Sequence, residues 1–374
     1  MIYLDNAATT PMSKKALDVY NLYASEQFYN PSGIYDVAVA VKNDIEEAKE
    51  TIKHALHTLN GNIIFTSSAT EANNLAIFGC LKSYFKKIVL SKAEHPSVYN
   101  IGIELQNRGF NVEFCPLQSN GQIDYEALEE ILDENTNLIS IMHVSNETGA
   151  INDLKKINEI RKRKCPKAIL HVDGVQAFTK IKVNLDYFGV DLYTISAHKI
   201  NGPKGVAALF VKNNLFLKPI IFGGGQEQNI RSGTENVPAI MAFKTAIQDV
   251  GDIDKNFEYV SFLKKIFLSN LNDLPYKNNS GDENSPYILS LSFKGVKGET
   301  LVHMLEEHKI YISTGSACSS KKSGNRVLLS MNISPNDIVG SVRISFSKNN
   351  TEHEVIEASK ILKETYYNLI DKLR

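Results

Sequence analysis

The sequence predicts an α/β protein with a mostly parallel β-sheet flanked by helices, together with a smaller α+β domain. From about residue 60 to 211, short runs rich in β-branched residues alternate with longer segments of helical spacing, which is typical of a parallel sheet. After about residue 250 this alternation stops. The chain has 374 residues, 43% of them hydrophobic and 22% charged, which is enough for one large domain and a smaller one.

The first part of the chain contains seven candidate strands. They lie at residues 62–65, 87–90, 112–114, 138–144, 168–172, 192–195 and 206–211. Apolar residues at helical spacing lie between them, for example Leu128, Ile131 and Leu132. Right-handed crossovers are the expected connections between parallel neighbours.

The second part of the chain mixes helices and strands without regular alternation. We expect a helix around Phe262 and Phe267, a strand at 288–293, a helix around Leu301 and a strand at 342–346. Thr351 and Glu354 have the spacing of a capping box, which predicts the start of a closing helix.

Composition and charge exclude several classes of protein. The 41 Lys and Arg residues balance 42 Asp and Glu residues, so we expect no nucleic acid or membrane surface as a partner. The basic run 161–164 ends a helical segment and is expected to be solvated. No apolar segment approaches the roughly 18–20 residues that span a bilayer, and the N-terminus does not resemble a signal peptide, so we expect a cytoplasmic protein.

The four cysteines are widely spaced and include no C-x-x-C pair. This spacing indicates neither a disulfide framework nor a set of zinc or iron–sulfur ligands. We therefore expect no metal site made of cysteines, and any cysteine with a function acts alone.

Functional side chains follow the predicted strands, at the edge where open parallel sheets bind ligands. After the first strand, Ser68 and Glu71 have capping-box spacing, and Thr70 adds a hydroxyl to a helix N-terminus that suits an anion. Later strands are followed by further polar residues: His95, Asn146, Asp173, Gln176, Ser196, His198 and Lys199. Taken singly, each has a structural explanation, such as a helix cap for Asp173.

Pyridoxal 5′-phosphate is the ligand that needs this whole set. It requires a lysine amine for a Schiff base, an acid opposite its pyridine nitrogen, an aromatic ring against its face, and hydroxyls at a helix N-terminus for its phosphate. Neither the G-x-G-x-x-G motif of dinucleotide sites nor a P-loop is present. A zinc site made of His95, His171 and His198 is disfavoured, because these histidines lack ligand spacing and lie beside a lysine.

The second part of the chain adds a cysteine and an arginine. Cys318 lies in a small, polar, glycine-flanked loop at about 313–326, expected to be mobile, and the two lysines that follow favour a reactive thiolate. Cys80, within an apolar helical pattern, fits a buried and inert thiol instead. Arg343 lies in the last strand and offers the planar fork that binds a carboxylate, although a surface charge is the alternative.

Taken together, these segments resemble the cysteine desulfurases among the class V, fold type I pyridoxal-phosphate enzymes, in the group with a G-S-A-C loop. The similarity runs nearly end to end, through YLDNAATTP, NPSG, SATEANN, AEHPSV, SNETG, HVDGVQA, SAHKINGPKG, GGGQE, RSGTEN, STGSACSS and SVRIS. It implies a fold type I transferase with a large cofactor-binding domain at 15–250. Residues 1–14 and 251–374 would form the small domain, which carries the cysteine loop and Arg343.

The resemblance also implies roles for the cofactor-binding residues. Lys199 would hold the cofactor, Asp173 would pair with the pyridinium nitrogen, and Gln176 would hydrogen-bond the ring oxygen. His95 would stack on the ring and shuttle protons. The phosphate would be held by Ala69, Thr70, Ser196 and His198, with Thr234 reaching across from a second subunit.

The implied activity is the conversion of L-cysteine to L-alanine by a homodimer. Asn146 and Arg343 would orient the substrate, and Cys318 would attack its sulfur and become a persulfide. A sulfur-acceptor protein, either an iron–sulfur scaffold or a tRNA-thiolating enzyme, would then take the sulfur.

Two other interpretations stay open. An aminotransferase, β-lyase or selenocysteine lyase could share the scaffold but would not need Cys318. A persulfide carrier or assembly platform with little turnover is disfavoured, because Lys199, Asp173 and Arg343 are all present.

Overall fold

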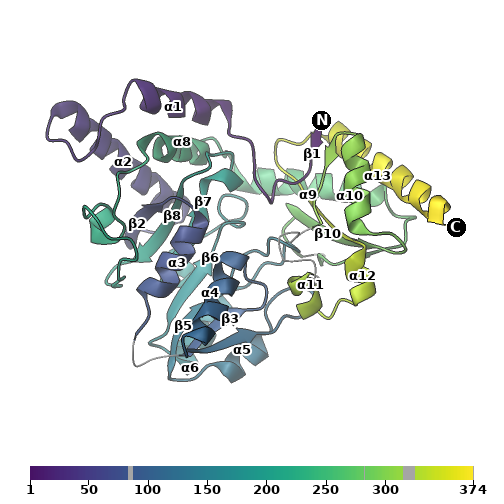
Figure 1. The fold of residues 1–374 in the computed structure, drawn as a ribbon, viewed down its shortest axis with the longest axis horizontal. Helices are drawn as coiled ribbons and strands as arrows, with labels where there is room; N and C mark the ends of the chain where they lie inside the picture. The colour runs from purple at the N-terminus through teal and green to yellow at the C-terminus, as the bar shows by residue number, and fades with distance from the viewer. Residues whose placement is uncertain (83–86, 282, 315–324, 374) are drawn as a thin grey trace.

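The computed structural model describes residues 1–82, 87–281, 283–314 and 325–373. Within these ranges the chain forms a seven-stranded sheet, a three-stranded sheet and a two-stranded pair. The larger sheet with its helices lies on one side of the molecule, and the smaller sheet lies on the other with both chain ends (Figure 1). The predicted α/β fold with a smaller α+β part is confirmed.

The large sheet is parallel except for one strand. In spatial order its strands are β2 (Gly61–Thr66), β8 (Ala207–Lys212), β7 (Leu192–Ser196), β6 (Ile169–Asp173), β5 (Thr136–Ser140), β3 (Lys87–Ser91) and β4 (Asn111–Cys115). Strand β8 runs antiparallel to both β2 and β7. The strand predicted at 138–144 already ends at Ser140, which is the last residue that pairs with β3 and β6, although the apolar run continues to Val144.

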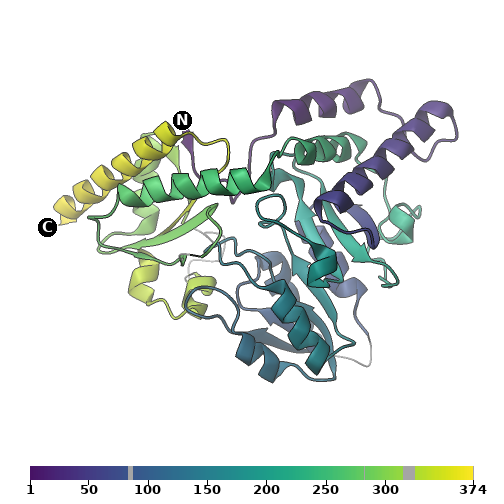
Figure 2. The same cartoon turned by 180° about the vertical axis from the view of Figure 1, so that it is seen from behind.

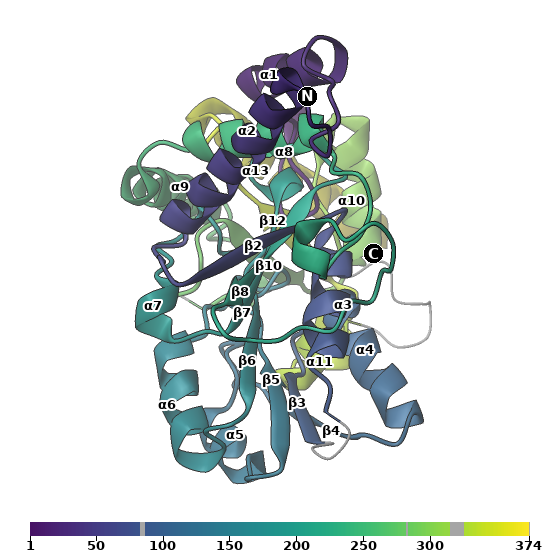
Figure 3. The ribbon, with the colours of Figure 1, turned by 90° about the vertical axis from the view of Figure 1, so that its left-hand side faces the viewer.

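Alternate side chains of each strand enter two different cores. Ile63 and Phe65 of β2 pack on one face of the sheet, while Ile64 packs on the other. One core is lined by α2 (Asp36–Ala55), α5 (Tyr125–Ile131), α6 (Leu154–Lys164), α7 (Leu185–Phe188) and α8 (Val237–Gln248), and the other by α3 (Ala69–Gly79) and α4 (Pro96–Asn107). Figure 3 shows α3 and α4 on the side of the sheet opposite α5, α6 and α7. Outside them, α1 (Lys14–Ser25) packs on α8.

The smaller sheet is antiparallel and has its own core. Its order is β12 (Ser341–Ser345), β10 (Ile288–Phe293) and β9 (Tyr276–Asn278), and it packs with α9 (Ile253–Ser269), α10 (Gly298–Glu307) and α13 (Glu352–Leu373). Figure 2 shows α9 and α13 side by side over this part of the molecule. The capping box predicted for the closing helix is present: Glu354 N donates to Thr351 Oγ1 at 3.2 Å and Thr351 N to Glu354 Oε2 at 2.9 Å.

Two segments pack into the core that is more distant from them in the sequence. Strand β1 (Ile2–Tyr3) pairs in parallel with β11 (Ile310–Tyr311), so the first residues join the smaller core. Conversely, Val327 and Leu328 of α11 (Arg326–Ser330) pack into the core of the large sheet, and α12 (Pro335–Val339) follows. The domain boundaries inferred from the sequence, 15–250 with 1–14 and 251–374, stay a prediction.

The solvated helix end predicted at 161–164 is wrong for its first residue. Arg161 is buried, donates to the carbonyl oxygen of Ala168 at 2.9 Å and forms an ion pair with Asp191. A buried guanidinium needs such partners, and Asp191 is too distant in sequence to be anticipated. In the described part of the chain, no helix is long and apolar enough to cross a membrane.

Gly174, directly after β6, packs against the buried ring of Tyr193. A Cβ at this position would lie 2.0 Å from a ring carbon, and the ring is held by a 2.8 Å hydrogen bond between its hydroxyl and His143 Nδ1. Gly174→Ala should therefore lower the free energy of unfolding by about 1–3 kcal/mol. Thermal unfolding measures the change, with Gly281→Ala as the control, since no atom lies closer than 3.6 Å to a Cβ there. Equal melting temperatures for Gly174→Ala and the parent would contradict this packing.

Candidate active site

Lys199 lies at the carboxyl edge of the large sheet, at the end of the short helix η1 (Ala197–Lys199) that follows β7. Its Nζ donates to the carbonyl oxygens of Ala7 and Ala8, each at 2.6 Å. Burial and the nearby Arg343 lower the pKa of Lys199 to about 8, although Asp5 and Asp173 oppose the shift. A substantial share of the amine is thus unprotonated near neutral pH, which is the nucleophilic form.

Asp173 and Gln176 lie beside Lys199 at the end of β6. Asp173 is 6% exposed, and its carboxylate accepts hydrogen bonds from Asn73 Nδ2 at 2.9 Å and from the backbone N–H of Val175 at 3.0 Å. Gln176 is also buried and donates through Nε2 to the carbonyl oxygen of Ala7 at 2.9 Å. The acid and the amide predicted for a cofactor ring therefore lie at the same edge as the lysine.

The segment predicted to bind an anion forms the N-terminus of α3. Ser68 caps this helix by accepting from the backbone N–H of Glu71 at 3.2 Å. In a capping box, Glu71 would also accept from the backbone N–H of Ser68. It accepts instead from the backbone N–H of Ser67 and forms an ion pair with Arg231 at 2.7 Å. Burial raises the pKa of Glu71, but the hydrogen bonds from Arg231 and Ser67 outweigh it and lower that pKa. Thr70 is exposed in the first turn.

Four further residues were predicted to contact the phosphate: Ser196, Ala69, His198 and Thr234. Ser196 is buried at the end of β7, and Ala69 is half-buried. His198 lies within hydrogen-bond distance of Thr9, and burial together with Lys199 lowers its pKa to about 4, so its ring is neutral. Thr234 is exposed and makes no hydrogen bond to the part of the chain that the structure describes.

His95 caps α4 through its own ring. Its Nδ1 accepts from the backbone N–H of Ser97 at 3.2 Å, which leaves the proton of the neutral ring on Nε2. His95 is partly exposed, but the protein packed around it lowers its pKa. The nearby Asp173 raises this pKa, and Lys199 lowers it further. Neutral His95 can thus keep the cap intact.

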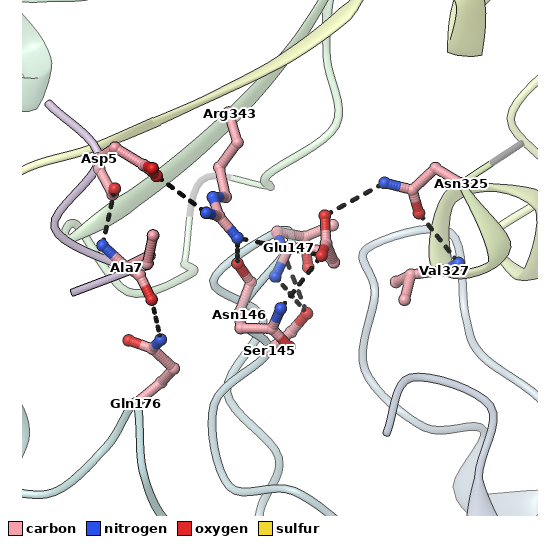
Figure 4. A network of polar contacts seen from close by, with 12 residues as sticks. Asp5, Ala7, Ser145, Asn146, Glu147, Gln176, Asn325, Val327 and Arg343 are labelled. Atoms are coloured by element: carbon pink, nitrogen blue, oxygen red, sulfur yellow. Dashed lines mark hydrogen bonds and ion pairs between the residues drawn. The ribbon is translucent and has the colours of Figure 1, made fainter. Parts of the chain in front are cut away.

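Arg343 is the centre of a buried polar network (Figure 4). Its Nη2 donates to Asp5 at 2.9 Å, and its Nη1 donates to the carbonyl oxygen of Asn146 at 2.9 Å and lies 3.9 Å from Glu147. Among the described residues, the buried Nε–H of this guanidinium has no hydrogen-bond partner. A ligand carboxylate is the kind of acceptor that this donor lacks.

Cys318 lies outside the described residues, but the residues on either side of its segment are placed. Ser313 exchanges two backbone hydrogen bonds with Arg343, of 3.0 and 2.6 Å. Asn325 donates to Glu147 at 3.1 Å (Figure 4). The chain therefore enters and leaves segment 315–324 at the same arginine network.

The partners of Arg343, and the hydrogen bonds that hold the segment before His95, could not be predicted from the sequence. Asp5 and Glu147 lie in the segments YLDNAATTP and SNETG. Nothing in these segments indicates that their carboxylates neutralise an arginine some 200 or more residues away. Arg326 donates to the carbonyl oxygens of Lys92 and Glu94, just before His95, and no signal in its own segment predicts this.

Comparison with known proteins places the chain in a family. The model of the family named Aminotransferase class-V matches residues 2–357. The chain belongs to this family. It is 35% identical over 381 aligned positions to the "Cysteine desulfurase IscS 1" of Archaeoglobus fulgidus, covering 100% of this chain and 98% of that protein. The "Cysteine desulfurase IscS" of Dictyoglomus turgidum is 36% identical and is covered to 95%, with all of this chain aligned.

Solved structures of class-V enzymes agree with the fold. A "NIFS-LIKE PROTEIN" superposes with a TM-score of 0.93 at 32% identity, covering 98% of this chain and 99% of that one. The structure titled "SspA in complex with cysteine" gives a TM-score of 0.84 at 30% identity, covering 94% of this chain and 100% of that one. The predicted class V, fold type I resemblance to cysteine desulfurases is confirmed, and the chain is an enzyme of this family.

The low pKa of Lys199 can be measured without substrate. In the cofactor-free protein, the rate of Lys199 methylation by formaldehyde and a borane should rise with pH with a midpoint near about 8. Arg343→Met should raise this midpoint, because it removes a cation that disfavours the protonated amine. Mass spectrometry follows Lys199, with the exposed Lys182 in the same digest as the reference. A lower or unchanged midpoint in Arg343→Met would contradict this electrostatic coupling.

Proposed function

We propose that the protein is a pyridoxal-phosphate-dependent cysteine desulfurase, which converts L-cysteine to L-alanine and takes up the sulfur on Cys318 as a persulfide. The observation that carries the proposal is the position of Lys199, Asp173 and Gln176 at one sheet edge, facing a network around Arg343 from which the Cys318 segment begins and ends. The names of the relatives support the same activity.

The residues present fit the cofactor. The carboxylate of Asp173 receives only neutral donors from Asn73 and Val175 and can pair with a cationic ring nitrogen. Lys199 would bond to the cofactor and Gln176 would donate to its ring oxygen. The phosphate would take the α3 N-terminus with Ala69, Thr70, Ser196 and His198, and His95 would cover the ring. Bound in this way, the cofactor supplies a conjugated cationic ring that accepts the electron pair released at the substrate Cα.

The protein's own groups then bind the substrate and move protons. The free Nε–H of Arg343 would hold the carboxylate of L-cysteine, with Asn146 beside it. The amine of Lys199, with its lowered pKa, would remove the α-proton. The Nε2–H of His95 would exchange a proton with the substrate on the open side of the site.

The sulfur step is redox-neutral overall. The Cys318 thiolate forms an S–S bond while the bond between substrate Cβ and sulfur breaks. The electron pair of the broken bond stays on carbon, which takes a proton and becomes the methyl group of alanine. Sulfur is oxidised as carbon is reduced, so no external oxidant is needed to form the Cys318 persulfide. An acceptor protein, an iron–sulfur scaffold or a tRNA-thiolating enzyme, would then take the sulfur.

We also propose that the enzyme is a homodimer. Ile34 is 97% exposed and Phe222 is 82% exposed, which is unusual for such large apolar side chains, and Phe28, Tyr35 and Ile221 near them in sequence are exposed as well. A second subunit would cover these side chains. It would also bring its exposed Thr234 to the phosphate site of this chain.

The activity is tested by measuring alanine and sulfide formed from L-cysteine with a reducing thiol present. The parent should form both in equal amounts with many turnovers, because the thiol reduces each persulfide and regenerates Cys318. Cys318→Ala should lose at least about 100-fold of the rate, since it lacks the nucleophile. Cys80→Ala is the matched control: Cys80 is buried, burial raises the pKa of its thiol to about 12, and its loss should leave the rate within about twofold.

Other outcomes of this assay would support the alternatives. Full alanine formation by Cys318→Ala would indicate a lyase that does not use the cysteine. Less than one alanine per parent active site would indicate a carrier with little turnover.

The dimer is tested by size-exclusion chromatography with light scattering. The purified protein should have twice the mass of one chain. Ile34→Glu should shift it toward the single-chain mass, because a charge would replace an apolar contact in the interface. Lys182→Glu, on an exposed lysine, is the control. A parent that elutes with the mass of one chain would contradict the dimer and the role of Thr234.

A further inference from the structure

Lys180 is a buried lysine that the proposed reaction does not use. It follows β6 by seven residues, and only 8% of its surface is exposed. Burial, reinforced by Lys199 and Arg343, lowers its pKa to about 7. Among the described residues, no carboxylate lies within ion-pair distance of its Nζ. Burying a lysine without a counter-ion costs free energy, so the hydrogen bond that Lys180 makes is the feature that explains its position.

Within the described part of the chain, Lys180 makes one side-chain hydrogen bond, to Gln176. Its Nζ donates to Gln176 Oε1 at 2.7 Å. Lys180 Nζ also lies 5.9 Å from the ring centre of Tyr287. In addition, Lys180 lines a cavity of about 40 Å³ together with Lys199 and Lys348. This volume suits a few waters at most. Lys180 therefore does not line a second substrate site.

Two contacts fix the orientation of the Gln176 amide. The amine of Lys180 donates to the amide, and only the oxygen of an amide accepts, so this oxygen faces Lys180. The carbonyl oxygen of Ala7 can only accept, so the nitrogen must face Ala7, at 2.9 Å. The carbonyl of Ala7 also accepts from Lys199 at 2.6 Å, so the nitrogen of Gln176 lies on the side where the cofactor would be bound.

We propose that Lys180 is a positioning residue that holds the Gln176 amide with its Nε2 donor toward the ring oxygen of the cofactor. This inference rests on the proposed function, because it assigns Gln176 to that oxygen. Without Lys180, the amide can turn and present its own oxygen to the ring oxygen. A donor would then be replaced by a repulsive acceptor, which is worse than losing the hydrogen bond alone.

The test measures cofactor binding, without cysteine. Lys180→Met keeps the length of the side chain but removes its donors. We expect the dissociation constant for pyridoxal phosphate to rise about three- to tenfold, as for the loss of one buried hydrogen bond. The midpoint in the pH titration of the visible absorbance, which reports the proton on the nitrogen of Lys199, should also rise, because the ring oxygen loses a donor and becomes a stronger acceptor for that proton.

The matched control is Lys87→Met. Lys87 is equally buried but pairs with Glu113 and Asp133 on the far edge of the sheet. Its loss should lower the melting temperature and leave both cofactor readouts unchanged. Should Lys180→Met fail to fold, Lys180→Leu takes its place with the same expectations, since it also removes the donors and is no larger than the lysine.

A double-mutant cycle with Gln176→Leu decides whether Lys180 acts through Gln176. In the Gln176→Leu background, Lys180→Met should change the dissociation constant by less than about twofold. An equal effect in both backgrounds, or no effect in the parent, would overturn the inference. A parent that binds no pyridoxal phosphate would overturn the proposed function as well, whereas a parent that binds it with Lys180→Met indistinguishable would overturn this inference only.

Discussion

The site depends on burying one guanidinium, that of Arg343. Removing a cation from water costs several kcal/mol, so each segment that contacts it must supply an acceptor or a negative charge. Asp5 supplies a carboxylate from the start of the chain, Asn146 a carbonyl from beyond β5, and Glu147 a second carboxylate. Satisfying one arginine thus brings the smaller sheet, the edge of the large sheet and the two ends of segment 315–324 together. The lowered pKa of Lys199 is a further result, since Arg343 contributes to it.

Most of the fold could be predicted because its signals are local. Buried strands such as β6 and β7 are short apolar runs between helical segments, and the crossover rule predicts the hand of their connections but not their order in the sheet. The end of β5 was misplaced by four residues, because the apolar run continues to Val144 while the pairing with β3 and β6 ends at Ser140. The packing of α11 into the large core is likewise decided by tertiary contacts.

The buried polar residues also divide into those that the sequence predicts and those that depend on tertiary contacts. Asp173 and Lys199 could be proposed from the sequence, because the carboxyl ends of parallel strands meet at one edge and polar residues there stand out against the apolar runs. Lys180 and Arg161 could not, since a buried lysine or arginine looks like a surface charge until its partner is known. Gln176 lies only four residues from Lys180, but the contact depends on how the turn after β6 folds. Cys318 was proposed from the small polar residues and lysines around it and from the resemblance of its segment to the G-S-A-C loop.

The path of the first ten residues has a consequence for how the protein is made. Leu4 and Asn6 bond to the backbone of Ser345, some 340 residues later, while Thr10 bonds to the carbonyl of His198. On a ribosome, every strand of the large sheet has been synthesised once Lys212 is made, yet Leu4 and Asn6 still lack their partner Ser345. Contacts of such long sequence separation form late. Synthesis therefore completes Lys199 and the strand ends around it first and Arg343 last. A chain terminated before residue 341 would contain Lys199 and these strand ends but would lack Arg343.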